Sequence, residues 1–258
     1  MGRIFSSVRS LKHTCCAILL AGGLVPQPTL SQDRTFSITG SAGYGLLSLG
    51  AVDAKNASDA VGWNALGIPV NDFASLKQSP FFSGRATYRY TRDVAFSVYG
   101  SYFSKTVSSS YSGSDAVLQL DRSVSATDLM LGVAYYPDLQ PYLFQWYLQA
   151  NVGVILARAT ARAVGTQATK PGGTVVMVPL VDSEGKYKKA QISAAFFVGA
   201  DMPLIQHIFI RGEAGYRVAQ VGELDGDITR FGVQSNESST TMFDFSGVLV
   251  SIGVGVAF

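Results

Sequence analysis

Apolar and polar side chains alternate in segments of about ten residues, and this pattern recurs from Phe36 to Phe258. Successive side chains of a β-strand point to opposite faces, so the pattern predicts strands that are each apolar on one face. No segment shows a convincing helical period. The eight alternating segments are Phe36–Leu46, Phe82–Tyr90, Val94–Tyr102, Asp128–Tyr135, Phe144–Val154, Ala190–Gly199, Ile208–Val218 and Gly247–Phe258.

The side chains on the second, less apolar face of each segment indicate whether that face contacts water and the apolar face contacts lipid. These second faces are mostly Gly, Ser, Ala and Thr, which are too small and too uncharged for a surface in water. Only 15% of the residues are charged, whereas an average soluble domain has roughly 25%. The alternative is a soluble secreted barrel, such as a lipocalin, with its apolar face inward. We favour apolar faces that contact lipid, because about nine to eleven tilted residues cross a bilayer as a strand.

Aromatic residues lie near the ends of the segments, as expected at the two interfaces of a membrane. Those near short connections are Phe36, Tyr88, Tyr90, Tyr135, Tyr142, Phe144, Trp146 and Phe258, and those towards long connections are Tyr44, Phe82 and Tyr102.

Short and long connections alternate strictly along the chain. Alternation places all the short turns at one rim of a hairpin barrel and all the long loops at the other. We therefore predict an all-β fold: a transmembrane antiparallel up-and-down β-barrel of eight strands, with short periplasmic turns and four long extracellular loops. Ten strands are the alternative, since residues 174–181 could add a strand or extend a hairpin above the membrane. The short turns are 91–93, 137–141 and 202–207, and the long loops are 49–80, 106–125, 159–188 and 220–241.

Residues 1–31 have the layout of a cleavable signal peptide. Arg3, Arg9 and Lys12 precede a short apolar stretch, and small residues stand before the predicted cleavage site after Ser31. The alternative is an amphipathic or buried N-terminal helix. Removing the leader changes the net charge from +2 to −1 and removes both cysteines. Residues 32–258 then form the predicted barrel domain, without a disulfide framework or a basic stripe for nucleic acid.

The final segment, VLVSIGVGVAF, resembles the C-terminal strand signal of Gram-negative outer-membrane proteins. The mature chain as a whole resembles small eight-stranded barrels of the OmpA transmembrane-domain and OmpX type. This resemblance implies location in the outer membrane, with outer-membrane lipid, lipopolysaccharide and the barrel-assembly machinery as partners. The residues that match the signal are Val250, Ile252, Val254, Val256 and Phe258.

Residues typical of catalysis are scarce. His207 is the one histidine of the predicted mature chain, and it falls in a short turn with no serine close by in sequence. We expect no catalytic residue, no cofactor and no metal ion, and hence no enzyme. The acidic residues of the long loops fit a solvated surface better than the alternative, a weak cation site. They are Asp53, Asp59, Glu223, Asp225 and Asp227.

Seven charged residues on the strands share the parity of the polar face and should point into the lumen. We predict two layers of ion pairs, in which Glu213 pairs with Arg211 or Arg89. Such pairs either fill the interior, which an eight-stranded barrel can just pack with side chains, or gate a narrow aqueous path. The seven residues are Arg85, Arg89, Asp128, Asp201, Arg211, Glu213 and Arg217.

Two classes of function follow. The first is a non-enzymatic surface protein with a structural role in the envelope, or with loops that bind an extracellular ligand, as in adhesion. The alternative is a narrow channel or porin-like transporter for small solutes, whose lumen is lined by Arg, Glu and Asp.

Overall fold

The computed structural model describes residues 36–137, 144–170 and 175–258. The predicted signal peptide, Tyr142 and most of the turn predicted at 137–141 lie outside these residues. Among the described residues, no helix has both the length and the apolar character needed to cross a bilayer.

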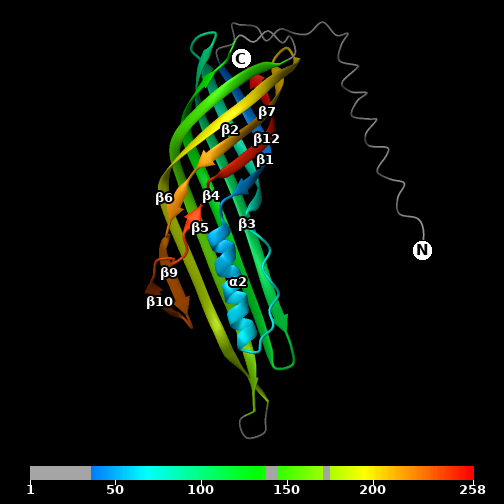
Figure 1. Cartoon of the computed structure of the whole chain (residues 1–258), viewed down its shortest axis with the longest axis vertical. Coiled ribbons are helices and arrows are strands. Elements are labelled where there is room, and N and C mark those ends of the chain that lie inside the picture. Colours follow the sequence, from blue (N-terminus) through cyan, green and yellow to red (C-terminus); the bar gives the residue numbers. More distant parts are fainter. Residues whose placement is uncertain (1–35, 138–143, 171–174) are drawn as a thin grey trace, which may run out of the picture.

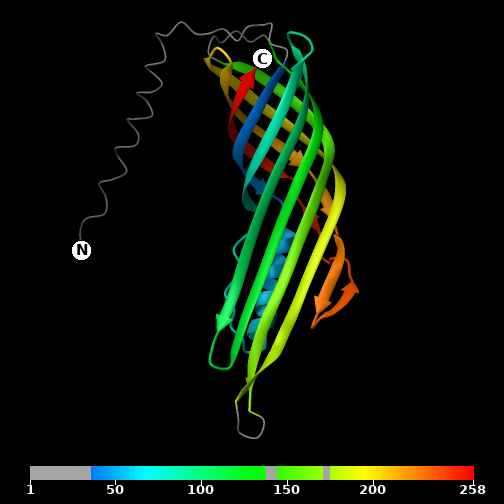
Figure 2. The same cartoon turned by 180° about the vertical axis from the view of Figure 1, so that it is seen from behind.

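Eight antiparallel strands close into a ring (Figures 1 and 2). Each strand pairs with the next along the chain, and the last pairs with both the first and the seventh. Closure removes the free edges that would otherwise need partners within a membrane. The strands of the ring are β1 (Phe36–Leu47), β2 (Gln78–Arg89), β3 (Val94–Ser112), β4 (Ala116–Tyr135), β5 (Gln145–Thr169), β6 (Val176–Ile205), β7 (Ile208–Val218) and β12 (Gly247–Ala257). The prediction of eight strands is confirmed.

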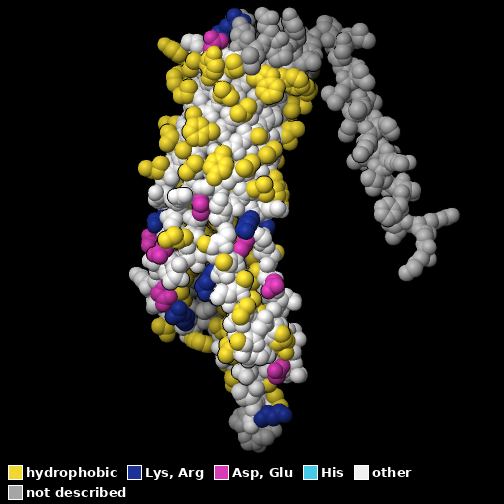
Figure 3. Space-filling model, viewed as in Figure 1, with side chains coloured by type: hydrophobic (Ala, Val, Ile, Leu, Met, Phe, Trp, Pro, Cys, Tyr) yellow, Lys and Arg dark blue, Asp and Glu magenta, His cyan; other side chains and the backbone are white. Residues whose placement is uncertain are grey.

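The apolar faces of the strands point outward, as predicted. Leu129 and Leu131 are 65% and 66% exposed, whereas Met130 between them is 1% exposed and faces the lumen. Figure 3 shows hydrophobic side chains gathered over the upper half of the molecule, and charged side chains mainly over the lower half. Such a belt is unfavourable in water and favourable in hydrocarbon. The ring therefore spans a membrane, and the lipocalin-like alternative is wrong.

The residues predicted to form the C-terminal signal all lie on this outer belt. Val250, Ile252 and Val254 are exposed on β12, and the ring of Phe258 lies 6.2 Å from that of Phe36 on β1. The last strand therefore closes the barrel beside the first.

Strands β3 to β6 continue far beyond the belt, on the side of the predicted extracellular loops, and form a wall (Figure 2). Their ladders run from the short turns to the tight hairpin between Ser112 and Ala116 and towards the β5–β6 hairpin, with one register shift between Gly165 and Thr166. The predicted long loops 106–125 and 159–188 are therefore mostly strand. They were missed because this part of the wall is not embedded in lipid, so its outer face is polar. The segment at 174–181 extends a hairpin and adds no strand to the ring.

The first long loop contains a helix, α2 (Gly50–Ala65), which contradicts the expectation that no segment is helical. Both views place α2 against one face of the wall (Figures 1 and 2). Ala60, Ile68 and Val70 of this loop pack on Leu118 and Leu120 of β4. The helix was missed because its buried face consists of only Val52, Asn56 and Ala60, too small a set to show a helical period.

The fourth long loop forms small strands as well. Strand β9 (Asp225–Arg230) pairs with residues 183–188 of β6, and β10 (Val233–Asn236) pairs with β9. Strands β8 (Gln220–Gly222) and β11 (Phe243–Asp244) form a two-stranded sheet. The main sheet thus has ten strands, the eight of the ring together with β9 and β10. At the other rim, β6 runs to Ile205, so the turn predicted at 202–207 is shorter than expected.

Candidate functional site

Six of the seven predicted lumenal charges form three buried ion pairs. Arg211 donates from Nε and Nη2 to both carboxylate oxygens of Asp201, each at 2.7 Å. Arg85 Nη1 lies 2.8 Å from Glu213 Oε2, and Arg217 Nη1 lies 2.5 Å from Asp128 Oδ2. The side chains of these pairs are at most 6% exposed.

Hydrogen bonds from neutral groups hold the carboxylates in place. Glu213 accepts from the hydroxyl of Tyr147 at 2.7 Å and from Ser251 at 3.0 Å. Asp128 accepts from Ser101 at 2.8 Å. Buried charges are tolerable only with such additional partners, because desolvation costs several kcal/mol per ion.

The pairing differs from the prediction in two respects. Glu213 pairs with Arg85, and neither Arg211 nor Arg89 takes that place. Arg89 donates to the amide oxygen of Gln145 at 3.0 Å and lies over the ring of Tyr136. Instead of the expected two layers, three pairs are stacked along the lumen. The stagger between neighbouring strands decides which residues reach the same height, and the alternation in the sequence does not contain this information.

Aromatic rings fill the space between the pairs. The Arg85 guanidinium lies 5.2 Å from the ring centre of Tyr99 and 5.5 Å from that of Phe197. A Cβ at Gly199 would lie 2.3 Å from the Tyr147 ring, so only glycine leaves room for that ring. The pocket beside Arg217 and Phe103, among the described lumenal residues, has a volume of only about 10 Å³. The side chains of these lumenal residues are almost fully buried, so the described part of the lumen is packed.

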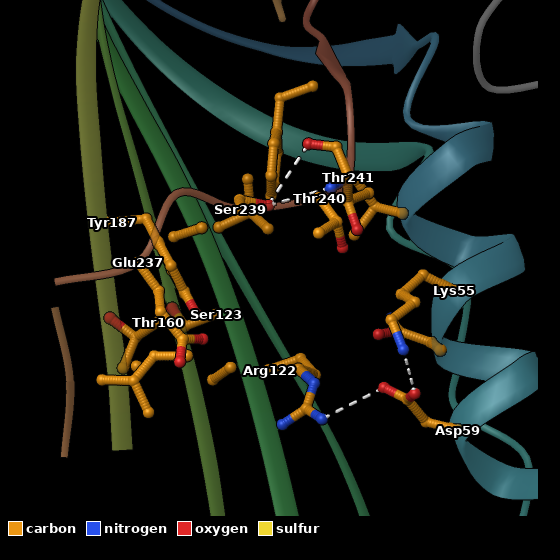
Figure 4. A pocket seen from close by; sticks show the side chains of 18 of the residues that line it. Lys55, Asp59, Arg122, Ser123, Thr160, Tyr187, Glu237, Ser239, Thr240 and Thr241 are labelled. Carbon is orange, nitrogen blue, oxygen red and sulfur yellow. Dashed lines mark hydrogen bonds and ion pairs between the residues drawn. The ribbon is translucent and has the colours of Figure 1, made fainter. Parts of the chain in front are cut away.

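A much larger cavity, of about 450 Å³, lies outside the membrane belt (Figure 4). Four parts of the chain line it: α2, the inner face of β4 to β6, strand β9, and the segment 237–243 that follows β10. The cavity is deep at the wall because the side chains there are small. Ala159, Ala161 and Gly185 are neighbours on β5 and β6.

Charged side chains at the rim of this cavity are paired. On α2, Asp59 bonds Lys55 and also accepts from Arg122 Nη2 of β4 at 3.3 Å, which connects the helix to the wall. Across the cavity, Arg230 Nη2 lies 3.1 Å from Glu237. The lining thus offers carboxylates and guanidinium groups a few ångströms apart, together with several hydroxyls.

Tyr187 of β6 lies beside Glu237, across the cavity from Lys55 and Asp59 (Figure 4). Partial burial raises the pKa of its phenol above the ordinary value of 10, and the nearby Glu237 carboxylate raises it further. The phenol is therefore neutral at physiological pH and can both donate and accept a hydrogen bond.

Sequence reasoning located Asp59 only as a solvated loop acid and missed the other cavity residues. Lys55 and Asp59 are one helical turn apart, but the helix itself was not recognised. Arg122 and Tyr187 fall in the segments taken for loops, so no parity placed them on one face.

Three other residues singled out in the sequence make local contacts. His207 lies in the β6–β7 turn, where Nδ1 is 3.2 Å from the Ala257 carbonyl oxygen. Asp225 accepts from Ser238, and Asp53 binds the segment that precedes β2. Within the described ranges, no group of three or more His, Cys, Asp or Glu side chains could hold a metal ion.

Comparison with protein-family models and with curated proteins gives no match. Among solved structures, the chain is similar to a major outer-membrane protein from Thermus thermophilus, with 12% identity, a TM-score of 0.49, and 87% of this chain and 99% of that one covered. It is similar to the outer-membrane protein OprG from Pseudomonas aeruginosa, with 14% identity, a TM-score of 0.45 and coverage of 88% and 98%. It is also similar to Ail, the attachment invasion locus protein of Yersinia pestis, with 12% identity, a TM-score of 0.38 and coverage of 87% and 99%. The closed ring of the chain itself and its exposed apolar belt, described above, indicate a place in a membrane.

Proposed function

We propose that this protein is a non-conducting surface protein of the bacterial outer membrane that binds a ligand through its extracellular wall. The observation that carries the proposal is the contrast between two interiors. The membrane-spanning lumen is packed with ion pairs and aromatic rings, whereas the extracellular end holds a cavity of about 450 Å³. Ligand pockets generally have volumes of roughly 300–1,000 Å³.

The architecture of the cavity supports a role in binding rather than in catalysis. Its lining has no histidine or cysteine, and both of its carboxylates are in ion pairs. Rigid strands support it, and a scaffold of this kind holds recognition groups in place at low entropic cost.

A second candidate is a gated path for small solutes. It is favoured by buried polar atoms around the pairs: Nε and Nη2 of Arg85, Oδ1 of Asp128 and Nη2 of Arg217 have no hydrogen-bond partner among the described residues. Buried polar atoms commonly bind water, and a line of them is what a narrow aqueous path requires.

Conductance in a planar bilayer separates the two candidates. We expect the refolded protein to give no discrete steps, with folding verified by heat-dependent gel mobility. The double variant Asp128→Ala/Arg217→Ala, which removes one complete pair without leaving a lone charge, is the matched positive control for an opened lumen. Reproducible steps from the wild type that change in this variant would replace the binding proposal with the channel.

A further inference from the structure

The chemistry of the extracellular cavity defines the class of its ligand, and this inference rests on the proposed function. An unsatisfied donor lies in its wall. Asn56, on the buried face of α2, is 3% exposed and lines the cavity, yet its Nδ2 has no hydrogen-bond partner in the described part of the chain. Leaving a buried amide donor unpaired is destabilising, so such a group is retained where something else accepts its hydrogen bond.

On the side of the cavity opposite α2, an aromatic ring offers a flat surface. Tyr187 lies against two glycines: a Cβ at Gly185 would be 2.8 Å from its Cε2, and one at Gly226 would be 2.7 Å from its Cδ1. Any larger residue at either position would lift the ring from the sheet. Because neither glycine has a side chain, one side of the ring can lie against the backbone. Tyr187 also lines the cavity.

The charged groups do not favour a simple anion. Asp59 bonds both Lys55 and Arg122, and Glu237 bonds Arg230, so each cation at the rim already has a carboxylate partner. Alternating carboxylates, guanidinium groups and hydroxyls suit a ligand whose groups donate and accept at the same time. Hydroxyl groups on a ring do this, and the C–H face of such a ring suits an aromatic surface.

We infer that the cavity binds a saccharide, with one sugar ring stacked on Tyr187 and its hydroxyls bonded to Asn56 and to the Asp59–Arg122 and Arg230–Glu237 pairs. The volume of about 450 Å³ limits the bound part to a short oligosaccharide segment. The ligand is therefore a glycan from outside the cell or the sugar part of a surface glycolipid.

The test uses the full-length mature protein in nanodiscs, fluorescently labelled and applied to an array of neutral, acidic, sulfated and phosphorylated oligosaccharides. We expect retention of a set of oligosaccharides, and isothermal titration with the best retained one gives the affinity. Tyr187→Ala should weaken binding roughly tenfold, the effect of losing one stacked aromatic contact. Tyr187→Phe, which keeps the ring, should retain most of the affinity. Tyr111→Ala, on the same wall but outside the cavity lining, is the matched control.

Asn56→Ala separates binding from structure. Alanine is smaller than asparagine, favours a helix and has no unpaired donor, so the variant should melt no lower than the wild type. Its affinity for the same oligosaccharide should nevertheless fall about tenfold, since a hydrogen bond to the ligand is lost. A group with only a structural role would change the melting temperature and the affinity together.

Three results would overturn the inference. The first is an array without retained oligosaccharides, and the second is retention that Tyr187→Ala leaves unchanged. The third is retention confined to sulfated or phosphorylated oligosaccharides that inorganic phosphate displaces, which would indicate an anion site. The second result would leave the proposed surface-binding function intact with its site elsewhere, whereas discrete bilayer conductance would contradict that function whatever the array shows.

Discussion

Glu213 illustrates how a single charged residue is retained inside the barrel. Its carboxylate is buried and accepts from Arg85, Tyr147 and Ser251. Each of its oxygens thus has a partner, which offsets the cost of removing the charge from water.

Glu213→Ala should destabilise the barrel by about 3–5 kcal/mol, because Arg85 remains buried without its partner. Urea unfolding of the protein in lipid vesicles, followed by tryptophan fluorescence, measures this loss. Glu237→Ala removes an exposed pair and should cost only about 0–1 kcal/mol. Similar small losses for both variants would show that the lumenal pair contributes nothing beyond a surface pair.

At the scale of elements, one carboxylate holds the start of α2. Asp53, in the first turn of the helix, accepts from the backbone N–H of Leu76 at 2.9 Å and from the hydroxyl of Ser75 at 2.6 Å. These bonds connect the start of the helix to the segment that enters β2. The helix in turn supplies one wall of the cavity.

Asp53→Ala should loosen α2 without unfolding the ring, because two hydrogen bonds to a charged group are lost, each worth roughly 1.5–3 kcal/mol. Hydrogen exchange should become faster over residues 50–77 and stay unchanged in β1 and β12. Asp72→Ala, an exposed aspartate of the same loop, is the control. Faster exchange throughout the barrel would contradict the independence of this element.

The eight strands of the ring could be predicted because lipid on one side and a packed lumen on the other impose opposite demands on alternate residues. The same rule placed Arg85, Asp128 and Glu213 inside. It failed for the first part of β4, before Val124, and for the start of β6. There the outer face contacts water, and both faces accept polar residues. The partner of Glu213 and the cavity around Tyr187 depend on strand stagger and on segments far apart in sequence, which no local pattern encodes.

At the scale of the whole molecule, the wall is longer than the membrane is thick. Strand β6 has 30 residues, which at roughly 3.3 Å per residue span about 100 Å. Crossing a bilayer takes only about nine to eleven of them. Most of the described part of β6 outside the belt therefore belongs to the surface that the cavity occupies.

Single cysteines should reveal this orientation, because the two cysteines of the chain, Cys15 and Cys16, both lie in the predicted leader. Ser235→Cys, exposed on β10, should react with a membrane-impermeant maleimide on intact cells. Gln206→Cys, in the turn between β6 and β7, should react only after the cells are lysed. The reverse pattern would place the wall and its cavity in the periplasm.

The long ladders of β3 to β6 also have a mechanical consequence. Hydrogen bonds of antiparallel strands lie perpendicular to the strands, and these strands run from the membrane to the end of the wall. A pull on the distal end, along the strands, therefore acts as shear and loads many hydrogen bonds at once, instead of opening them one after another. A cell tethered through this wall would detach by release of the ligand before the protein tears.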